Sequence, residues 1–316
     1  MKIKEAFARI KKIKKPLSTN RISFSYTNQA ILKDITLNLK KSEILAIIGK
    51  SGSGKSTFLK LISGIISKKY AGKIKIFGKP KFFKKSKIGF VPQELSFIPD
   101  LSLYDNIRIT GLNLGLSEKT ALNRAEKFLT FLKMDESLNK FPRELSGGQK
   151  VRFNIVLSLL HEPEIIVLDE PFVGLDFSNR KLLWHFIESL KNKGKSIILT
   201  SHLLTETQEH VDRLIILKNG KILFNGNLER LKQKFKLNYI FEIRFSRLSK
   251  DNFNKIKKYC TYKEIPILDN YERYLMIGIK TEKQRKMLLN LFSKLNLQFK
   301  EISFREPNLD EIFLKT

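Results

Sequence analysis

The stretch that decides the fold is Ile44-Leu45-Ala46-Ile47-Ile48-Gly49-Lys50-Ser51-Gly52-Ser53-Gly54-Lys55-Ser56-Thr57. It begins with an apolar run and continues with a full match to the phosphate-loop pattern G-x-x-x-x-G-K-[ST]. Glycines let backbone N–H groups turn toward one point, and a following helix adds its N-terminal dipole to that anion site. The stretch therefore predicts a buried strand, a phosphate-binding loop and a helix. Lys55 would hold the β- and γ-phosphates of a nucleotide, and Ser56 would ligate Mg²⁺.

A second apolar run, Ile165-Ile166-Val167-Leu168, ends in the carboxylates Asp169 and Glu170. This pattern is typical of a buried parallel strand whose C-terminal end opens onto a site. Asp169 suits a water-mediated contact with Mg²⁺, and Glu170 could polarise the attacking water as a general base. Taken alone, such a strand end is more often the start of a solvated loop, so the assignment depends on the other motifs.

These motifs occur, together with several others, in the order found in the nucleotide-binding subunits of ABC transporters, which the chain resembles. The residues that carry the resemblance are Gly49–Thr57 (Walker A), Gln93 (Q-loop), Leu145-Ser146-Gly147-Gly148-Gln149 (signature), Ile165–Glu170 (Walker B and catalytic glutamate), Gly174-Leu175-Asp176 (D-loop) and His202 (switch histidine). The resemblance covers about residues 21–230 and, more weakly, the tail. Chance agreement of this many ordered motifs is negligible.

The resemblance implies that two copies of the chain, or this chain and a paralogous subunit, sandwich two ATP molecules head to tail. Each ATP would contact the phosphate loop of one chain and the signature of the other. A Ser-Gly-Gly sequence is also typical of a helix N-cap turn, and the two interpretations are compatible. The residues assigned to catalysis are Glu170, His202 and Gln93, and those assigned to Mg²⁺ are Ser56, Gln93 and Asp169. The residues assigned to ATP are Tyr26, Gly49, Lys50, Ser51, Gly52, Ser53, Gly54, Lys55, Ser56, Thr57, Ser146, Gly147, Gly148, Gln149 and Asp176.

Three of these side chains are assigned by their place in the family pattern. Tyr26 matches the aromatic residue that stacks on adenine, although an edge-strand tyrosine with no ligand is also common. His202 follows a predicted strand, Ser196–Thr200, and would bond the γ-phosphate and orient the water. Gln93 would coordinate Mg²⁺ or water and sense the γ-phosphate. The remaining histidines, interpreted as satisfied surface residues, are His161, His185 and His210.

The alternation of strand and helix patterns predicts an α/β fold with a mainly parallel sheet. By resemblance this is a P-loop NTPase of ABC type with an antiparallel β edge. Amphipathic spacing between residues 95 and 145 predicts its helical subdomain. The expected organisation is a basic N-terminal extension (1–20), an ABC ATPase domain (21–230) and a C-terminal accessory α+β domain (231–316).

The tail after a lysine-rich connector, Leu231–Leu237, reads as β-α-β-β-α-β, which predicts a small ferredoxin-like domain. Asn308 and Glu311 have the spacing of a capping box at a last short helix. The expected strands are 239–245, 264–268, 274–279 and 298–304, and the expected helices are 250–259 and 282–295.

The formal net charge of +29 is a property shared with many proteins that bind nucleic acid. The lysines, however, are spread along the chain, and no zinc spacing, RRM signature or second ATPase cassette accompanies them, so nucleic acid is not an expected partner. Residues 1–15 are basic with a partial apolar stripe, which fits a membrane-surface helix or a solvated tail. No apolar run approaches the length of about 18 residues needed to span a bilayer. Cys260 is the only cysteine, which excludes an internal disulfide and fits a reducing cytosol.

The end of the chain narrows the resemblance to exporter ATPases that serve type-2 ABC permeases. The phrases that carry it are Ser201–Glu206, Asn225–Leu228 and Glu306–Leu314. Departures from the family pattern are Leu157-Ser158-Leu159, where many relatives have Arg-Ala-Leu, and Phe172-Val173, where Thr-Ser is usual. The resemblance implies an ATPase at the cytoplasmic face of the cell membrane that powers export through a separate permease. The alternative is a cytosolic ABC ATPase acting on ribosomes or nucleic acid.

Overall fold

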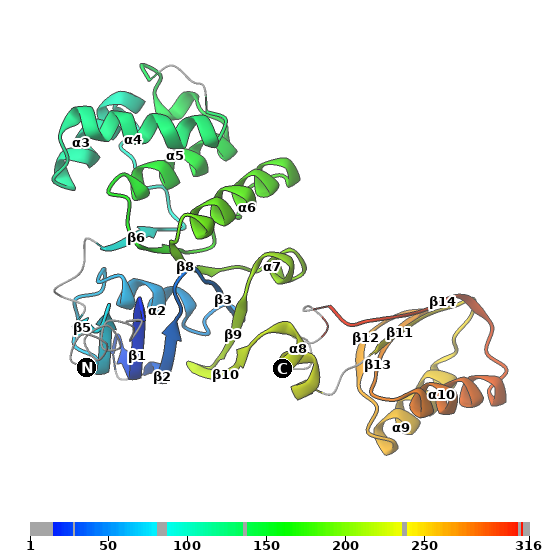
Figure 1. Ribbon diagram of the computed structural model, residues 1–316. Helices are drawn as coiled ribbons and strands as arrows, with labels where there is room; N and C mark the ends of the chain where they lie inside the picture. Colours follow the sequence, from blue (N-terminus) through cyan, green and yellow to red (C-terminus); the bar gives the residue numbers. More distant parts are fainter. Residues whose placement is uncertain are drawn as a thin grey trace, which may run out of the picture. The chain divides into compact units, whose positions relative to one another are not determined.

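A computed structural model describes residues 15–27, 29–80, 87–134, 138–235, 239–308 and 311. It divides into two compact units, one up to Asn225 and one from Gly226 (Figure 1). This division falls before the limit that the sequence suggests at Arg230. The predicted membrane-surface helix or basic tail lies, apart from Lys15, outside the described residues.

The first unit contains a four-stranded antiparallel sheet in the order β2-β1-β4-β5. Its strands are β1 (Leu17–Ser25), β2 (Ala30–Leu39), β4 (Ala71–Ile76) and β5 (Lys79–Pro80). Apolar side chains such as Leu17, Ile22 and Phe24 are buried and alternate with exposed ones, as expected of a sheet with one face toward the core. This sheet is the antiparallel β edge that the resemblance implies.

A six-stranded sheet in the order β10-β9-β3-β8-β7-β6 forms the centre of the first unit. Its strands are β3 (Ile44–Ile48), β6 (Ile88–Val91), β7 (Ile165–Leu168), β8 (Ser196–Thr200), β9 (Arg213–Lys218) and β10 (Lys221–Gly226). The pairs β3–β8, β3–β9, β6–β7 and β7–β8 are parallel, which confirms the mainly parallel sheet. Only β10 returns through a two-residue turn, Asn219-Gly220, whose residues both have positive φ. Helix α2 (Lys55–Ile62) shares one hydrophobic core with both sheets.

Helices α3 (Leu103–Asn113), α4 (Glu118–Phe131) and α5 (Gly147–Leu159) pack on one another and form the helical subdomain at the top of Figure 1. A short 3₁₀ turn, η2 (Pro142–Glu144), precedes α5, while α6 (Phe177–Asn192) and α7 (Leu204–His210) follow β7 and β8. Side-chain oxygens cap four of these helices by accepting a first-turn N–H; the caps are Ser102, Ser117, Ser146 and Asp176. Among the described helices, none is both long and apolar enough to cross a membrane.

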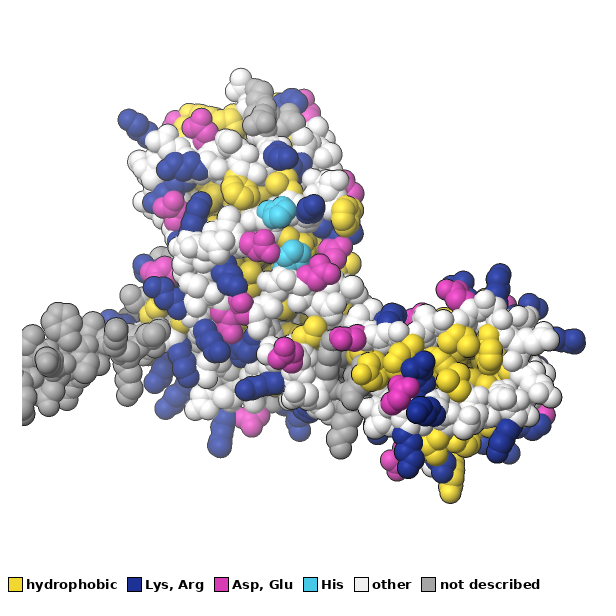
Figure 2. All heavy atoms as spheres, turned by 45° about the vertical axis from the view of Figure 1, so that its right-hand side comes forward, with side chains coloured by type: hydrophobic (Ala, Val, Ile, Leu, Met, Phe, Trp, Pro, Cys, Tyr) yellow, Lys and Arg dark blue, Asp and Glu magenta, His cyan; other side chains and the backbone are white. Residues whose placement is uncertain are grey.

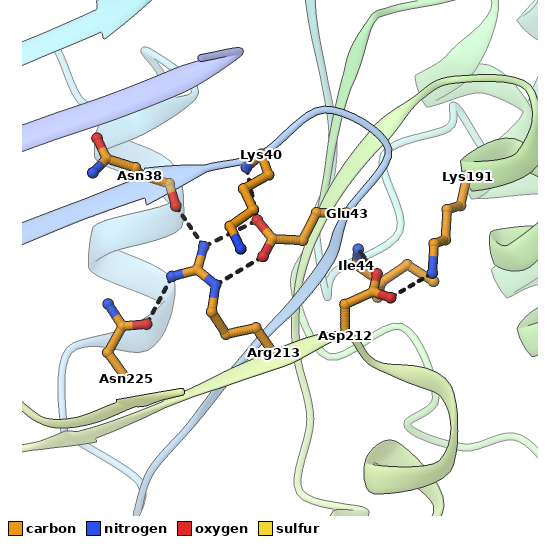
Figure 3. Close-up of polar contacts among 8 residues, drawn as sticks. All are labelled: Asn38, Lys40, Glu43, Ile44, Lys191, Asp212, Arg213 and Asn225. Atoms are coloured by element: carbon orange, nitrogen blue, oxygen red, sulfur yellow. Dashed lines mark hydrogen bonds and ion pairs between the residues drawn. The ribbon is translucent and has the colours of Figure 1, made fainter. Parts of the chain in front are cut away.

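A buried ion pair fastens the N-terminal ends of the central strands (Figure 3). Arg213 of β9 donates from Nε to Glu43 Oε1 (2.8 Å) and from Nη2 to Glu43 Oε2 (3.0 Å). The same guanidinium donates to Asn225 Oδ1 and to the carbonyl oxygen of Asn38. Because these partners come from β2, β10 and the start of β3, the ion pair joins the two sheets at the end opposite to the phosphate loop.

The second unit has a four-stranded antiparallel sheet in the order β12-β13-β11-β14. Its elements are β11 (Tyr239–Phe245), α9 (Lys250–Tyr262), β12 (Ile267–Tyr271), β13 (Tyr274–Ile279), α10 (Glu282–Lys294) and β14 (Phe299–Arg305). Helices α9 and α10 lie on one face of this sheet and share its hydrophobic core (Figure 1). The predicted capping box is confirmed, because Asn308 N donates to Glu311 Oε2 (2.6 Å) and Glu311 N donates to Asn308 Oδ1 (3.1 Å).

Two expectations for this unit were wrong in detail. The segment read as a connector, Leu231–Leu237, overlaps helix α8 (Leu228–Phe235), which begins three residues earlier. Asn227 caps this helix by accepting from Arg230 N (3.1 Å), and Leu231 is fully buried in it. The strand expected at 264–268 begins later, because α9 ends with Glu264 at φ 51° and with Ile265 N bonded to Cys260 O. This helix-ending motif occupies the residues that the apolar pattern assigned to a strand.

Candidate active site

The candidate site lies where the parallel strands β3, β7 and β8 end. Parallel strands bring their carboxyl ends to one edge, so the phosphate loop, the Asp169-Glu170 pair and His202 converge there. A cavity of about 740 Å³ opens at this edge, a volume within the roughly 300–1,000 Å³ typical of small-molecule sites. Its lining residues are Gln29, Ala30, Ile31, Lys33, Ser51–Thr57, Gln93, Glu170, His202, Asn219 and Gly220.

Three positions of the loop require glycine, for two different structural reasons. Gly52 and Gly54 have φ angles of 76° and 103°, a left-handed backbone that other residues rarely adopt. Gly49 lacks room for a side chain, because an added Cβ would lie 2.4 Å from Leu217 O. Substitution at any of the three would therefore move the loop that leads into α2.

Lys55 begins α2 and extends its side chain back along the loop. Its Nζ donates to Gly49 O (2.8 Å) and lies 3.8 Å from Glu170 Oε1. Burial lowers the pKa of Lys55, while the nearby Glu170 and Asp169 carboxylates act in the opposite direction. The ammonium group therefore supplies a positive charge at the lining of the cavity, which suits a phosphate ligand.

Ser56 and Asp169 fit a Mg²⁺ ion by the chemistry of their oxygens. Ser56 Oγ donates to Asp169 Oδ1 (3.0 Å), so one hydrated cation could contact both groups. Mg²⁺ prefers oxygen ligands and usually keeps waters and substrate phosphates in its coordination sphere.

Glu170 is buried at the wall of the cavity, with a backbone φ of 53°. Its Oε1 lies 2.9 Å from His202 Nε2, whose ring is largely exposed. Burial raises the pKa of Glu170, although His202 and Lys55 oppose the shift. A carboxylate with a raised pKa is a stronger base, which is the property that proton abstraction from water requires.

Thr200 is a site residue that the sequence analysis did not identify. It is fully buried at the end of β8, where its Oγ1 donates to Asp169 Oδ1 (2.9 Å) and accepts from Glu170 N (2.9 Å). One hydroxyl thus orients both carboxylate residues. The available signal was a polar residue that ends the apolar strand β8 just before His202.

Asn154 of α5 was also missed. Its Oδ1 accepts from Ser96 N (3.0 Å) and Ser96 Oγ (2.7 Å), and its Nδ2 donates to Pro92 O (3.3 Å). These contacts hold backbone groups on both sides of Gln93 in the sequence, while Gln93 itself is exposed and lines the cavity. The available signal in the sequence was an asparagine among the apolar residues of α5, because such a polar side chain needs hydrogen-bond partners.

The signature residues do not line the cavity of their own chain. Ser146 and Gln149 form a capping box at the start of α5, with Ser146 N donating to Gln149 Oε1 (2.8 Å) and Gln149 N donating to Ser146 Oγ (3.3 Å). Gly147 faces open space, whereas a Cβ on Gly148 would lie 2.9 Å from Asn179 Nδ2. The helix-cap interpretation of the signature is therefore confirmed, and the side chain of Gln149 serves that cap.

Asp176 and Tyr26 also lie outside the cavity lining. Asp176 caps α6 by accepting from Asn179 N (2.8 Å), a hydrogen bond that lowers the pKa of its carboxyl group. Tyr26 follows β1, has 43% of its surface exposed and packs edge-on against Phe24 at a ring distance of 4.9 Å. The last two phosphate-loop residues outside the lining are Gly49 and Lys50, and the Lys50 carbonyl accepts from Ser53 N (3.1 Å) within the loop.

Comparison with known proteins agrees with this geometry. The profile of the ABC transporter family matches residues 32–173. The ergothioneine transport ATP-binding protein EgtV of Helicobacter pylori is 37% identical over 65% of this chain and 99% of that protein. The chain belongs to the ATP-binding subunits of ABC transporters.

Further similarities extend the match along the chain. The linearmycin resistance ATP-binding protein LnrL of Bacillus subtilis is 29% identical over 94% of this chain and 97% of that protein. A solved structure described as the ATP-binding subunit of an ABC transporter has a TM-score of 0.64 at 30% identity, covering 69% of this chain and 92% of that one. The protein is thus an ABC ATPase that hydrolyses ATP for transport.

Proposed function

We propose that two copies of this ABC ATPase, or this chain and a paralogous subunit, hydrolyse MgATP at two composite sites and drive export through a separate membrane permease. The single observation that carries the catalytic part is the placement of Glu170 Oε1, 2.9 Å from His202 Nε2 and 3.8 Å from Lys55 Nζ at the cavity wall. The chain would work at the cytoplasmic face of the cell membrane, bound to its permease.

Each side of the cavity has a role toward ATP. Lys55 leaves the Gly49 carbonyl to bind the β- and γ-phosphates, and the loop N–H groups at the start of α2 complete the anion site. Ser56, Asp169 and Gln93 hold Mg²⁺, which would neutralise phosphate charge. The exposed ring of Tyr26 supplies a face for adenine.

Hydrolysis follows from the arrangement of the two catalytic side chains. Glu170 accepts a proton from water as the water oxygen attacks the γ-phosphorus, and the bond from that phosphorus to the β–γ bridging oxygen breaks. The products are ADP and inorganic phosphate. His202 bonds a γ-phosphate oxygen and fixes the water in line. Thr200 orients Glu170 and Asp169 through its hydroxyl group.

The signature acts on the ATP of the partner copy. The first turn of a helix leaves its N–H groups without intrahelical partners, and the capping box uses only that of Gln149. Gly147 and Gly148 therefore keep N–H groups for a γ-phosphate, and the open space at Gly147 lets that phosphate approach. Asp176, at the start of the neighbouring α6, lies beside this surface because Asn179 contacts both its side chain and Gly148.

Export is favoured by the second unit and by two relatives. The strand order β12-β13-β11-β14 with two helices on one face is that of a ferredoxin-like β-α-β-β-α-β domain, which we assign as an accessory domain of the exporter type. One of the relatives whose match extends through this unit is named a linearmycin resistance ATP-binding protein, and another relative is named a Nod factor export ATP-binding protein. On the face that Figure 2 draws, lysine and arginine side chains are scattered among other side chains of both units, which does not favour nucleic acid.

Replacing Glu170 with Gln tests the catalytic part. We expect steady-state ATP hydrolysis to fall by roughly 10² to 10⁴-fold, because the general base is lost, while ATP binding measured by calorimetry is retained. Glu164→Gln is the matched control: it makes the same chemical change just before β7, at the opposite end of this strand, where Glu164 pairs with Lys87. Undiminished hydrolysis by Glu170→Gln would remove Glu170 from this role.

Purification of the tagged chain from detergent-solubilised membranes tests the transport part. We expect a polytopic membrane protein to copurify and to stimulate or inhibit ATP hydrolysis. Comigration with ribosomes at moderate salt, with none of the chain in the membrane fraction, would instead support the cytosolic alternative.

A further inference from the structure

Helix α6 presents a row of side chains to α7 that the mechanism above does not use. Arg180, Trp184 and Glu188 are four residues apart, so they lie on one face of α6. Glu206 and His210 have the same spacing on α7. The two rows meet, which brings the helix after the switch histidine against the helix after the D-loop.

The first contact between the rows is an ion pair. Arg180 Nε lies 2.9 Å from Glu206 Oε1 and 3.1 Å from Glu206 Oε2. The same guanidinium donates from Nη1 to the carbonyl oxygen of Leu175 (3.0 Å) in the D-loop. Arg180 therefore fastens the first part of α7 to the D-loop backbone.

The second contact is a stack of three rings, Phe172, Trp184 and His210, which we call the aromatic stack. The ring centroids of Phe172 and Trp184 are 4.4 Å apart with an interplanar angle of 28°, and those of Trp184 and His210 are 4.4 Å apart at 16°. Trp184 is 2% exposed, and its indole N–H has no acceptor within the described chain. Ring packing, not a hydrogen bond, therefore fixes Trp184.

A carboxylate holds the His210 end of the aromatic stack. His210 Nδ1 lies 2.7 Å from Glu188 Oε1, on the same face of α6 as Trp184. The neighbouring His185 lies 3.7 Å from Glu188 Oε2 and is mostly exposed. Histidine and acidic side chains accordingly lie together on the surface of the first unit (Figure 2). The interpretation of His210 as a surface histidine is incomplete, since it also packs on the single tryptophan.

These contacts connect the chain segments that follow the two catalytic residues, Glu170 and His202. Phe172 follows Glu170 by two residues, and α7, which ends at His210, begins two residues after His202. His202 in turn contacts Glu170. Helix α7 has only seven residues, too few to be stable without tertiary contacts, so its position depends on its packing against β3 and on the contacts that α6 supplies.

We propose that the aromatic stack of Phe172, Trp184 and His210 positions α7 and thereby holds the His202 imidazole against Glu170. The three are positioning residues that act through His202, and the inference rests on the roles proposed above for Glu170 and His202. If the aromatic stack served only core packing, its substitution would lower stability without a selective effect on turnover.

Replacing His210 with Ala removes one ring of the aromatic stack. We expect kcat for ATP to fall about tenfold with KM changed less than about twofold, since a misplaced catalytic group affects the transition state more than ATP binding. His210→Phe keeps a flat ring and should restore kcat to within about threefold of the original. His185→Ala, which removes the other histidine beside Glu188, should leave kcat unchanged. Trp184 is the sole tryptophan, so its fluorescence should change in His210→Ala, less in His210→Phe and not in His185→Ala.

A double mutant tests whether His210 acts through His202. In a His202→Ala background, His210→Ala should cause less than about a twofold further loss, because coupled residues are not additive. The inference would be overturned if His210→Ala kept full activity, or if it caused an equal loss in both backgrounds. It would also be overturned if kcat fell in both His210 variants only to the extent that their thermal midpoints fell. Full turnover by Glu170→Gln or His202→Ala would instead contradict the proposed catalytic roles.

Discussion

Glu170 is a buried carboxylate, and its ionisation links catalysis to stability at the scale of one residue. Burial raises the pKa of Glu170, so between its ordinary value and the raised value the folded state keeps a proton that the unfolded chain releases. Stability without nucleotide therefore decreases as pH rises through that range. Glu170→Gln removes the ionisation, and we expect its melting temperature to exceed that of the unaltered chain near pH 7. The excess should shrink toward about pH 4, where glutamates become protonated.

Thermal unfolding at constant ionic strength measures this difference. Glu164→Gln removes one negative charge at an exposed position and controls for the change in net charge. A melting-temperature difference that is the same at pH 4 and pH 7, or an unaltered chain that is the more stable at neutral pH, would contradict the assigned direction.

At the scale of elements, motifs that are continuous in sequence were predictable. The phosphate loop, the strand ending in Asp169 and the strand Ser196–Thr200 each contain their own signal, an apolar run followed by residues of special chemistry. Parallel pairing then brings their ends to one edge without further information. The convergence of these motifs on one cavity could therefore be predicted from the sequence.

The supporting contacts were not predictable, because each joins elements that are distant in sequence. Thr200 acts on a neighbouring strand, and Asn154 binds a loop 58 to 62 residues earlier. The place of α8 was also missed, because the sequence around the buried Leu231 is rich in charged residues. A pattern along the chain reports which side chains are apolar, but it does not report which backbone groups a buried polar side chain will meet.

At the scale of the whole molecule, the two units have separate hydrophobic cores. The described core of the first unit runs from Leu17 to Leu217, and that of the second runs from Phe241 to Phe292. The relative EgtV matches over 99% of its own length but only 65% of this chain, so a protein of its size has no counterpart for about a third of the residues here. Because a domain with its own core can fold alone, we expect the ATPase unit to fold without the second unit.

Truncation after Asn227 keeps β10 and removes the second unit. We expect this shortened chain to unfold cooperatively and to hydrolyse ATP with kcat within about twofold of the full chain, because every proposed catalytic residue and its supports lie before the cut. Truncation after Lys218 is the matched control: it also removes β10 and Asn225, whose side chain accepts from Arg213 Nη1 (2.7 Å) beside the Glu43 ion pair. Removing one partner of that guanidinium and leaving the edge of β9 unpaired should lower the unfolding midpoint sharply. If the chain cut after Asn227 lost cooperative unfolding, the second unit would be needed to stabilise the ATPase core. Its first role would then be structural.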